Sequence, residues 1–96
     1  MLGQGYYLLR SRSDGRYLLA QPDEQRQFLL MFTADHAALS YLNAHAPELT
    51  PQFAVESVSQ TQLKTLMDRW GFAGMAMVND PLVPDIDFLR RQTGLP

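Results

Sequence analysis

Short apolar segments separated by turn residues open the chain and predict strands. The aromatic and aliphatic runs Tyr6–Ser11 and 16–21 flank Asp14-Gly15, the preferred pair for a two-residue hairpin turn of type I′. Pro22-Asp23-Glu24 supplies a second turn before the apolar run 27–33, because proline fixes φ for a turn and cannot continue a central ladder. We therefore expect three consecutive strands that form a meander.

The third of these strands is apolar on both faces. Phe28, Leu30 and Phe32 point to one side of an extended chain, whereas Leu29 and Met31 point to the other. Such a run is typical of a strand covered on both sides, or of a sheet whose second face meets a partner.

The middle of the chain changes to a helical period. Thr33 and Asp35 suit the N-cap and first turn of a helix that runs to Ala46, and Pro47 prevents its easy continuation. The apolar stripe of this helix is rich in alanine, which suits close packing on a sheet. A further strand is expected at Phe53–Val58.

The clearest helix spans residues 59–72. Ser59 and Gln62 have the spacing of a capping box, and Gly71 is placed for a left-handed residue at the C-terminal end. The expected apolar stripe of this helix consists of Leu63, Leu66, Met67 and Trp70.

The last third of the chain predicts one more strand, at residues 74–78, and a short terminal helix. Pro84 and Asp85 are expected to begin that helix, which ends near Gly94. The order of elements is then βββαβαβ plus the C-terminal helix. Strands joined through a helix are normally parallel with right-handed crossovers. We therefore expect a single α/β (α+β) domain, residues 1–96, with a mixed sheet of about five strands and two main helices.

The balance of charges and the absence of cysteine narrow the class of protein. Eight basic residues against ten acidic ones give a formal charge of −2, which argues against a polyanion binder. Without cysteine there are no disulfides, thiolate metal sites or cysteine nucleophiles. The first residues lack the pattern of a secretory signal, and no apolar stretch approaches the length that crosses a bilayer. We expect a cytoplasmic protein that does not enter a membrane.

Few residues carry candidate chemistry for catalysis or metal binding. His36 and His45 lie nine positions apart on one helix, so they point in different directions and cannot share a metal ion. Asp80, Asp85 and Asp87 cluster after the last strand, where magnesium is conceivable, but turn formation and helix capping account for them. We predict no catalytic residue, no cofactor and no metal site, so the protein is not expected to be an enzyme.

Arginine and tyrosine side chains concentrate around the first hairpin: Arg10, Arg12, Arg16, Tyr6 and Tyr17. Arginine beside tyrosine can grip a phosphate or stack on a base, so the three arginines are candidate anion-binding residues. They define an alternative function, a nucleic-acid or nucleotide-binding module. The presence of Asp14 among them argues for a charged edge strand that resists edge pairing, and hence against nucleic acid.

Two groups of short motifs are similar to a known family. Phe32-Thr33-Ala34-Asp35-His36-Ala37-Ala38, after an aliphatic strand, resembles the strand and alanine-rich helix of the SseB-type family. Later motifs resemble the second helix and last strand of that family in their order, namely Val58-Ser59, Leu63, Leu66, Gly74 and Val78-Asn79-Asp80-Pro81. The resemblance covers residues 27–81, with Asp80 as an insertion before the proline. It implies a small α/β fold without an established catalytic site, and no active residues to carry over.

Together these patterns predict a non-catalytic protein-interaction or accessory domain, either a homo-oligomer or bound to a protein partner. Two helices are expected to cover one face of the sheet and leave the other apolar face of the third strand for that partner. The candidate interaction residues are Leu29, Met31, Met75, Met77 and Phe88.

Overall fold

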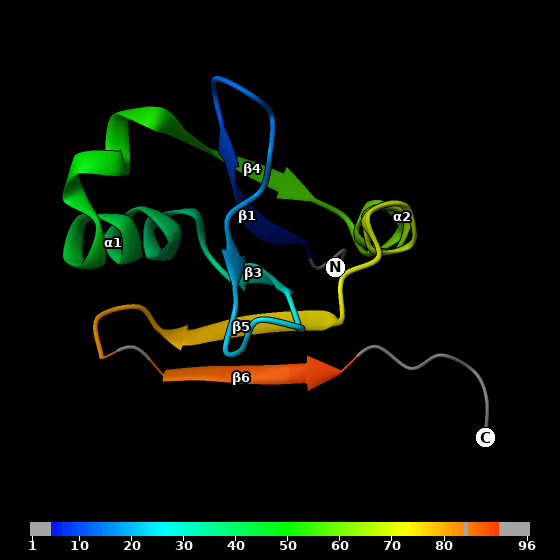
Figure 1. Cartoon of the computed structure of the whole chain (residues 1–96). Helices are drawn as coiled ribbons and strands as arrows, with labels where there is room; N and C mark the ends of the chain where they lie inside the picture. The colour runs from blue at the N-terminus through cyan, green and yellow to red at the C-terminus, as the bar shows by residue number, and fades with distance from the viewer. Residues whose placement is uncertain (1–4, 84, 91–96) are drawn as a thin grey trace.

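The computed structural model describes residues 5–83 and 85–90, which form a mixed six-stranded sheet with helices on both faces (Figure 1). The elements in chain order are β1 (Tyr6–Ser11), β2 (Leu19–Ala20), β3 (Phe28–Phe32), α1 (Asp35–His45), the 3₁₀ helix η1 (Pro47–Gln52), β4 (Phe53–Val58), α2 (Gln60–Trp70), β5 (Gly74–Asp80) and β6 (Asp85–Arg90). The strand order is β4-β1-β3-β5-β6, with β2 beside β3. The predicted α/β class and mixed sheet are confirmed.

β3 is the inner strand that joins the two parts of the sheet. It pairs in parallel with β5 and antiparallel with β1 and β2, while β1 and β5 pair antiparallel with β4 and β6. Strands β3, β4 and β5, which are linked through helices, therefore share one direction, as the crossover argument predicts.

β1 and β2 lie on the same side of β3. Tyr7 of β1 is opposite Phe32, and Leu19 of β2 is opposite Leu29, both in antiparallel register. The residues between them form a hairpin that extends past β4 (Figure 1). The expected meander is wrong. β1 and β2 both pair directly with β3, one after the other along the same edge of that strand, and are not successive neighbours across the sheet.

The hairpin itself is confirmed, but its turn is longer than the expected two residues. Ser11 donates its N–H to the carbonyl of Arg16 at 2.7 Å, so residues 12–15 form the loop. Gly15 has φ 73°, and no described residue other than glycine has a positive φ. A type I′ turn needs a positive φ at both central residues, so Asp14 does not fit it. The Asp14 carboxylate instead accepts the N–H of Arg16 at 3.0 Å, a side-chain contact that stabilises the longer loop.

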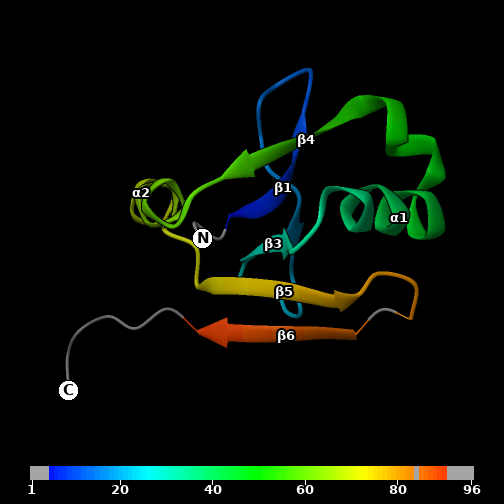
Figure 2. The same ribbon diagram turned by 180° about the vertical axis from the view of Figure 1, so that it is seen from behind.

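The helices α1 and α2 lie on opposite faces of the sheet (Figures 1 and 2). The connection β3–α1–β4 moves toward one edge of the sheet, and β4–α2–β5 moves back toward the other. Right-handed crossovers that run in opposite directions place their helices on opposite faces. The expectation that both helices cover one face is therefore wrong.

Each face of β3 has its own apolar core. The core on the α1 side contains Leu9, Phe28, Leu30, Phe32, Ala38, Leu42, Ala76 and Val78. The core on the α2 side contains Leu8, Leu29, Met31, Val58, Leu63, Met67 and Phe72. Leu29 and Met31 are 0% and 1% exposed, so these two predicted interaction residues are not on the surface. Their assignment to a partner interface is wrong because α2 covers the face to which they point.

α1 begins without the predicted cap. Its N-cap is Ala34 rather than Thr33, and no side-chain hydrogen bond caps it. The Asp35 carboxylate accepts the N–H of its neighbour His36 at 2.7 Å, which compensates one unpaired amide of the first turn. The helix ends at His45, and Pro47 begins η1.

α2 has both predicted ends. Gln62 donates its N–H to the hydroxyl of Ser59 at 3.1 Å, and Ser59 donates its N–H to the side-chain oxygen of Gln62 at 2.9 Å. Gly71 ends the helix at φ 67°, in the left-handed region. These local signals were sufficient because all the partners lie within a few residues of one another.

The expected terminal helix is wrong, because residues from Asp85 onward form β6. Ile86 is opposite Val78 and Phe88 is opposite Ala76 in antiparallel register with β5. Acidic and apolar residues alternate at the start of this segment, which is a strand period, and the turn before it returns the chain along β5. The expected helix end at Gly94 lies outside the described residues.

Candidate functional site

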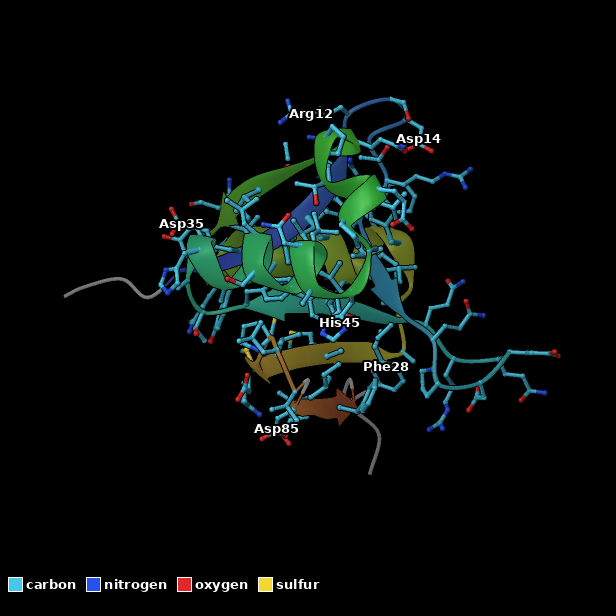
Figure 3. All side chains as sticks on the ribbon, turned by 90° about the vertical axis from the view of Figure 1, so that its left-hand side faces the viewer. Arg12, Asp14, Phe28, Asp35, His45 and Asp85 are labelled. Carbon is cyan, nitrogen blue, oxygen red and sulfur yellow. The ribbon has the colours of Figure 1, made fainter. Side chains whose placement is uncertain are left out.

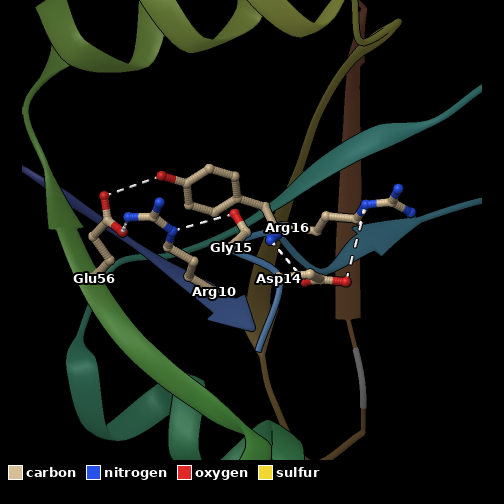
Figure 4. A network of polar contacts seen from close by, with 6 residues as sticks. Arg10, Asp14, Gly15, Arg16 and Glu56 are labelled. Carbon is tan, nitrogen blue, oxygen red and sulfur yellow. Dashed lines mark hydrogen bonds and ion pairs between the residues drawn. The ribbon is translucent and has the colours of Figure 1, made fainter. Parts of the chain in front are cut away.

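A polar network on the α2 side of the sheet joins the first hairpin to β4 (Figure 4). Glu56 is opposite Leu8 in the β1–β4 register, which places its carboxylate on the same face as Arg10. Arg10 Nη1 lies 3.3 Å from Glu56 Oε1, and Tyr17 donates its hydroxyl to Glu56 Oε2 at 3.0 Å. Arg10 Nε also donates to the carbonyl of Gly15 at 3.2 Å, so the network ties the hairpin to β4.

The electrostatics of this region favour a neutral tyrosine and a charged aspartate. Burial, together with the hydrogen bond to the Glu56 carboxylate, raises the pKa of Tyr17 above its ordinary value of 10.0. The backbone N–H of Arg16 and the hydroxyl of Ser11 lower the pKa of Asp14 below its ordinary value of 3.8. Tyr17 is therefore a hydrogen-bond donor at neutral pH, and Asp14 is an acceptor.

The structure separates the three predicted anion-binding arginines. Arg10 is engaged by Glu56, whereas the Arg16 side chain is 79% exposed with its Nε 4.0 Å from Asp14. The Arg12 side chain is exposed and forms no ion pair with any residue of 5–83 or 85–90. Of the tyrosines named with them, Tyr17 joins the network, whereas Tyr6 packs against the core on the α2 side. Anion binding by these arginines stays a prediction.

Three adjoining hollows surround this network, two on the α2 face and one at the edge formed by the hairpin and β4. The first, of about 220 Å³, is lined by Arg16, Tyr17, Leu19, Gln27, Trp70 and Phe72. The second, of about 270 Å³, is lined by Tyr17 and Glu56 and by residues of β4 and α2, namely Val58, Thr61, Gln62, Thr65 and Leu66. The third, of about 640 Å³, is a wide opening over the hairpin and β4 that includes Arg10, Arg12 and Glu56. Tyr17 lines the first and second hollows, and Glu56 lines the second and third. The three hollows therefore form a continuous row, with the hydrogen-bonded pair of Tyr17 and Glu56 between them.

Sequence reasoning missed two residues of this row. Trp70 was expected in the apolar stripe of α2, but it is 50% exposed, and its ring stacks on Phe72 with 6.4 Å between centroids and 5° between planes. Helical periodicity identifies which residues lie on the apolar face of α2. It does not show whether the sheet beneath α2 extends far enough to bury each of them. Glu56 carried no local signal, because its partner Arg10 is 46 positions away.

The outer strand β6 forms a second candidate surface. Phe88 and Leu89 are 45% and 46% exposed and, as neighbours in a strand, point to opposite faces. Leu89 is opposite Met75 of β5, and Met75 and Met77 are partly buried at the margin of the core on the α2 side. Three of the five predicted interaction residues, Met75, Met77 and Phe88, thus lie on β5 and β6.

The histidines and the late aspartates form local contacts, and Figure 3 shows His45 at the end of α1 and Asp85 at the start of β6. The ring nitrogen Nε2 of His45 lies 2.8 Å from the carbonyl oxygen of Pro81, which holds the β5–β6 turn against the end of α1. Asp80 accepts the N–H of Leu82 in that turn, and Asp87 accepts the side-chain amide of Asn79. Within residues 5–83 and 85–90, no three histidine, aspartate or glutamate side chains gather as metal ligands do.

These features define an α/β domain with a mixed six-stranded sheet, a polar network on one face and an outer strand with two exposed apolar side chains, Phe88 and Leu89. Comparison of the chain with protein-family models, with curated proteins and with solved structures gives no match. The SseB-type resemblance therefore stays a prediction from short motifs. None of the helices in the described part of the chain is long and apolar enough to cross a membrane.

Proposed function

We propose that this chain is a non-catalytic interaction domain that associates with a second copy of itself through β6. The observation that carries the proposal is the exposure of Phe88 and Leu89, at 45% and 46%, on a strand that ends the sheet of the described residues. The argument from the apolar faces of β3 no longer applies, because both faces are buried within one chain.

The geometry of an edge strand supports pairing with an identical strand. β6 pairs with β5 along one edge, and no strand formed by residues 5–83 or 85–90 lies beside the backbone groups of its other edge. Two copies of β6 in antiparallel orientation form a two-fold contact in which each strand supplies the same groups to the other. That pairing would extend the sheet from one chain into the next.

The exposed side chains add apolar area to such a contact. Phe88 packs edge-on against the core residue Phe28, with 5.0 Å between ring centroids and 73° between planes, so its ring is already held in place. Leu89 continues the apolar surface of Met75 on the other face. Covering this surface on both faces of the sheet is favourable at about 25 cal/mol per Å² of apolar area, before association costs.

The test is the mass of the protein in solution, measured by sedimentation equilibrium over a range of concentrations. We expect a dimer for the unmodified chain and a monomer for Leu89→Lys, because the substitution replaces an apolar side chain of the proposed contact with a charge that the contact would bury. Leu39→Lys on α1 is the matched control, since Leu39 is 42% exposed and lies away from β6; it should remain a dimer.

Two results would overturn the proposal. One is a strictly monomeric unmodified chain at the highest concentration that the measurement allows. The other is a dimer that Leu89→Lys leaves intact, which would place the contact elsewhere.

A further inference from the structure

The row of three hollows has no lining residue on β6. We propose that it binds an extended acidic peptide of a partner protein, with two apolar side chains of that peptide in the hollows on either side of Tyr17. This inference goes beyond self-association and uses none of the residues on which self-association depends.

The two hollows beside α2 suit alternate side chains of an extended chain. Trp70, Phe72 and Leu19 give the first hollow apolar walls, and Val58 and Leu66 do the same for the second. The ring of Tyr17 separates them, because it lines both. Side chains two residues apart in a strand point the same way and lie roughly 7 Å apart, so one can enter each hollow while the residue between them passes over Tyr17.

The charges of the row favour an acidic occupant. Its lining includes the cations Arg10, Arg12 and Arg16 and one acid, Glu56, which pairs with Arg10, while Asp14 lies 4.0 Å from Arg16 at the margin of the row. The whole chain has eight basic and ten acidic residues, so five basic residues and nine acidic ones lie elsewhere. The row is therefore less acidic than the rest of the chain. Arg12, which is exposed and has no ion pair among the described residues, can attract a carboxylate to one end, and Arg16, 79% exposed beside Asp14, lies at the other end.

The polar groups along the row favour a peptide over a nucleic acid. The side-chain oxygen of Gln62 accepts a bond from Ser59, which leaves its NH₂ group to donate to a peptide carbonyl. Glu56 sits at the centre of the row, where its carboxylate can accept from a peptide N–H but would repel a phosphate.

The first experiment selects peptides from a displayed library of random twelve-residue sequences on the purified full chain. We expect enriched peptides that are acidic and have apolar residues two positions apart. The same selection on Arg16→Glu should lose them, because Arg16 is the exposed cation of the first hollow. Selection of neutral or basic peptides, or of none, would overturn the proposal.

The second experiment uses the fluorescence of Trp70, the one tryptophan of the chain. A synthetic copy of an enriched peptide should change the emission on titration, and Arg16→Glu should weaken binding at least tenfold. Lys64→Glu is the control, since it makes the same change of charge at an exposed position of α2 that lines none of the three hollows. Its binding should stay within about twofold of the unmodified chain, and an equal loss in both variants would contradict a specific site.

Two further arms separate the alternatives. A twelve-residue oligothymidylate should not change the emission of Trp70, and tighter binding of this strand than of the peptide would assign the row to nucleic acid instead. Leu89→Lys should bind the peptide as well as the unmodified chain does. Because this variant tests the two proposals separately, a failure of self-association can be distinguished from a failure of peptide binding.

Discussion

At the scale of single residues, Tyr17 links the first hairpin to β4 and to the hollows beside α2. Its hydroxyl donates to Glu56, its ring lies 5.7 Å from the Arg10 guanidinium, and it separates two of the three hollows. Its role therefore depends on the neutral phenol, which alone can donate to the carboxylate.

We expect Tyr17→Phe to lower the free energy of unfolding by about 1 kcal/mol at neutral pH, because the bond to Glu56 is lost while the ring remains. The raised pKa of Tyr17 gives the effect a pH dependence. The stabilisation from the neutral hydroxyl is fully present below the ordinary value of 10.0 and is lost as the pH rises through the higher folded value. Denaturant unfolding of both proteins from pH 7 to 11 tests this. The two stabilities should converge at high pH, and a difference that stays constant would contradict the assigned bond.

At the scale of elements, α2 shows how far local signals specify a helix. Its two ends were predicted because the capping box and the left-handed glycine involve neighbours in the chain. β6 shows the opposite case, since proline and aspartate at its start fit a helix N-terminus as well as a turn. The pairing with β5 decided between them.

We expect Ser59→Ala to cost about 1 kcal/mol of stability, because it leaves the N–H of Gln62 without its partner at the start of α2. Ser57→Ala is the matched control at an exposed position of β4, and it should change stability by less than about 0.5 kcal/mol. Chemical denaturation monitored by circular dichroism gives both values. Equal effects of the two substitutions would show that the capping box does not stabilise α2.

At the scale of the whole molecule, the position of α2 determines which surfaces are free. Because α2 covers Leu29 and Met31, the apolar character of β3 stabilises the single chain. The surfaces that we propose for association are the outer strand β6 and the row of hollows beside α2.

We expect Met31→Ala to lower the free energy of unfolding by about 2–5 kcal/mol, because it leaves a cavity between β3 and α2. The mass in solution should not change, since Met31 is 1% exposed within one chain. Met75→Ala, at a partly buried neighbour on the same face, should cost less. If Met31→Ala instead abolished association with little loss of stability, the burial described above would be contradicted.

The sequence by itself determined the class of fold, most strands, both main helices and the two-sided apolar character of β3. These depend on the period of side chains and on hydrogen bonds between close neighbours, which a single segment contains. The same reasoning identified Arg10 and Tyr17 as candidate site residues. It could not identify Glu56 as their partner, because these hydrogen bonds join segments that are far apart in the chain.

Only the tertiary structure decided the strand order, and with it the placement of the helices on opposite faces. It also decided that the last described segment is a strand and that Trp70 stays half exposed. Each of these depends on which distant segments pair, a choice made by the free energy of the whole sheet and both cores rather than by any one stretch of residues.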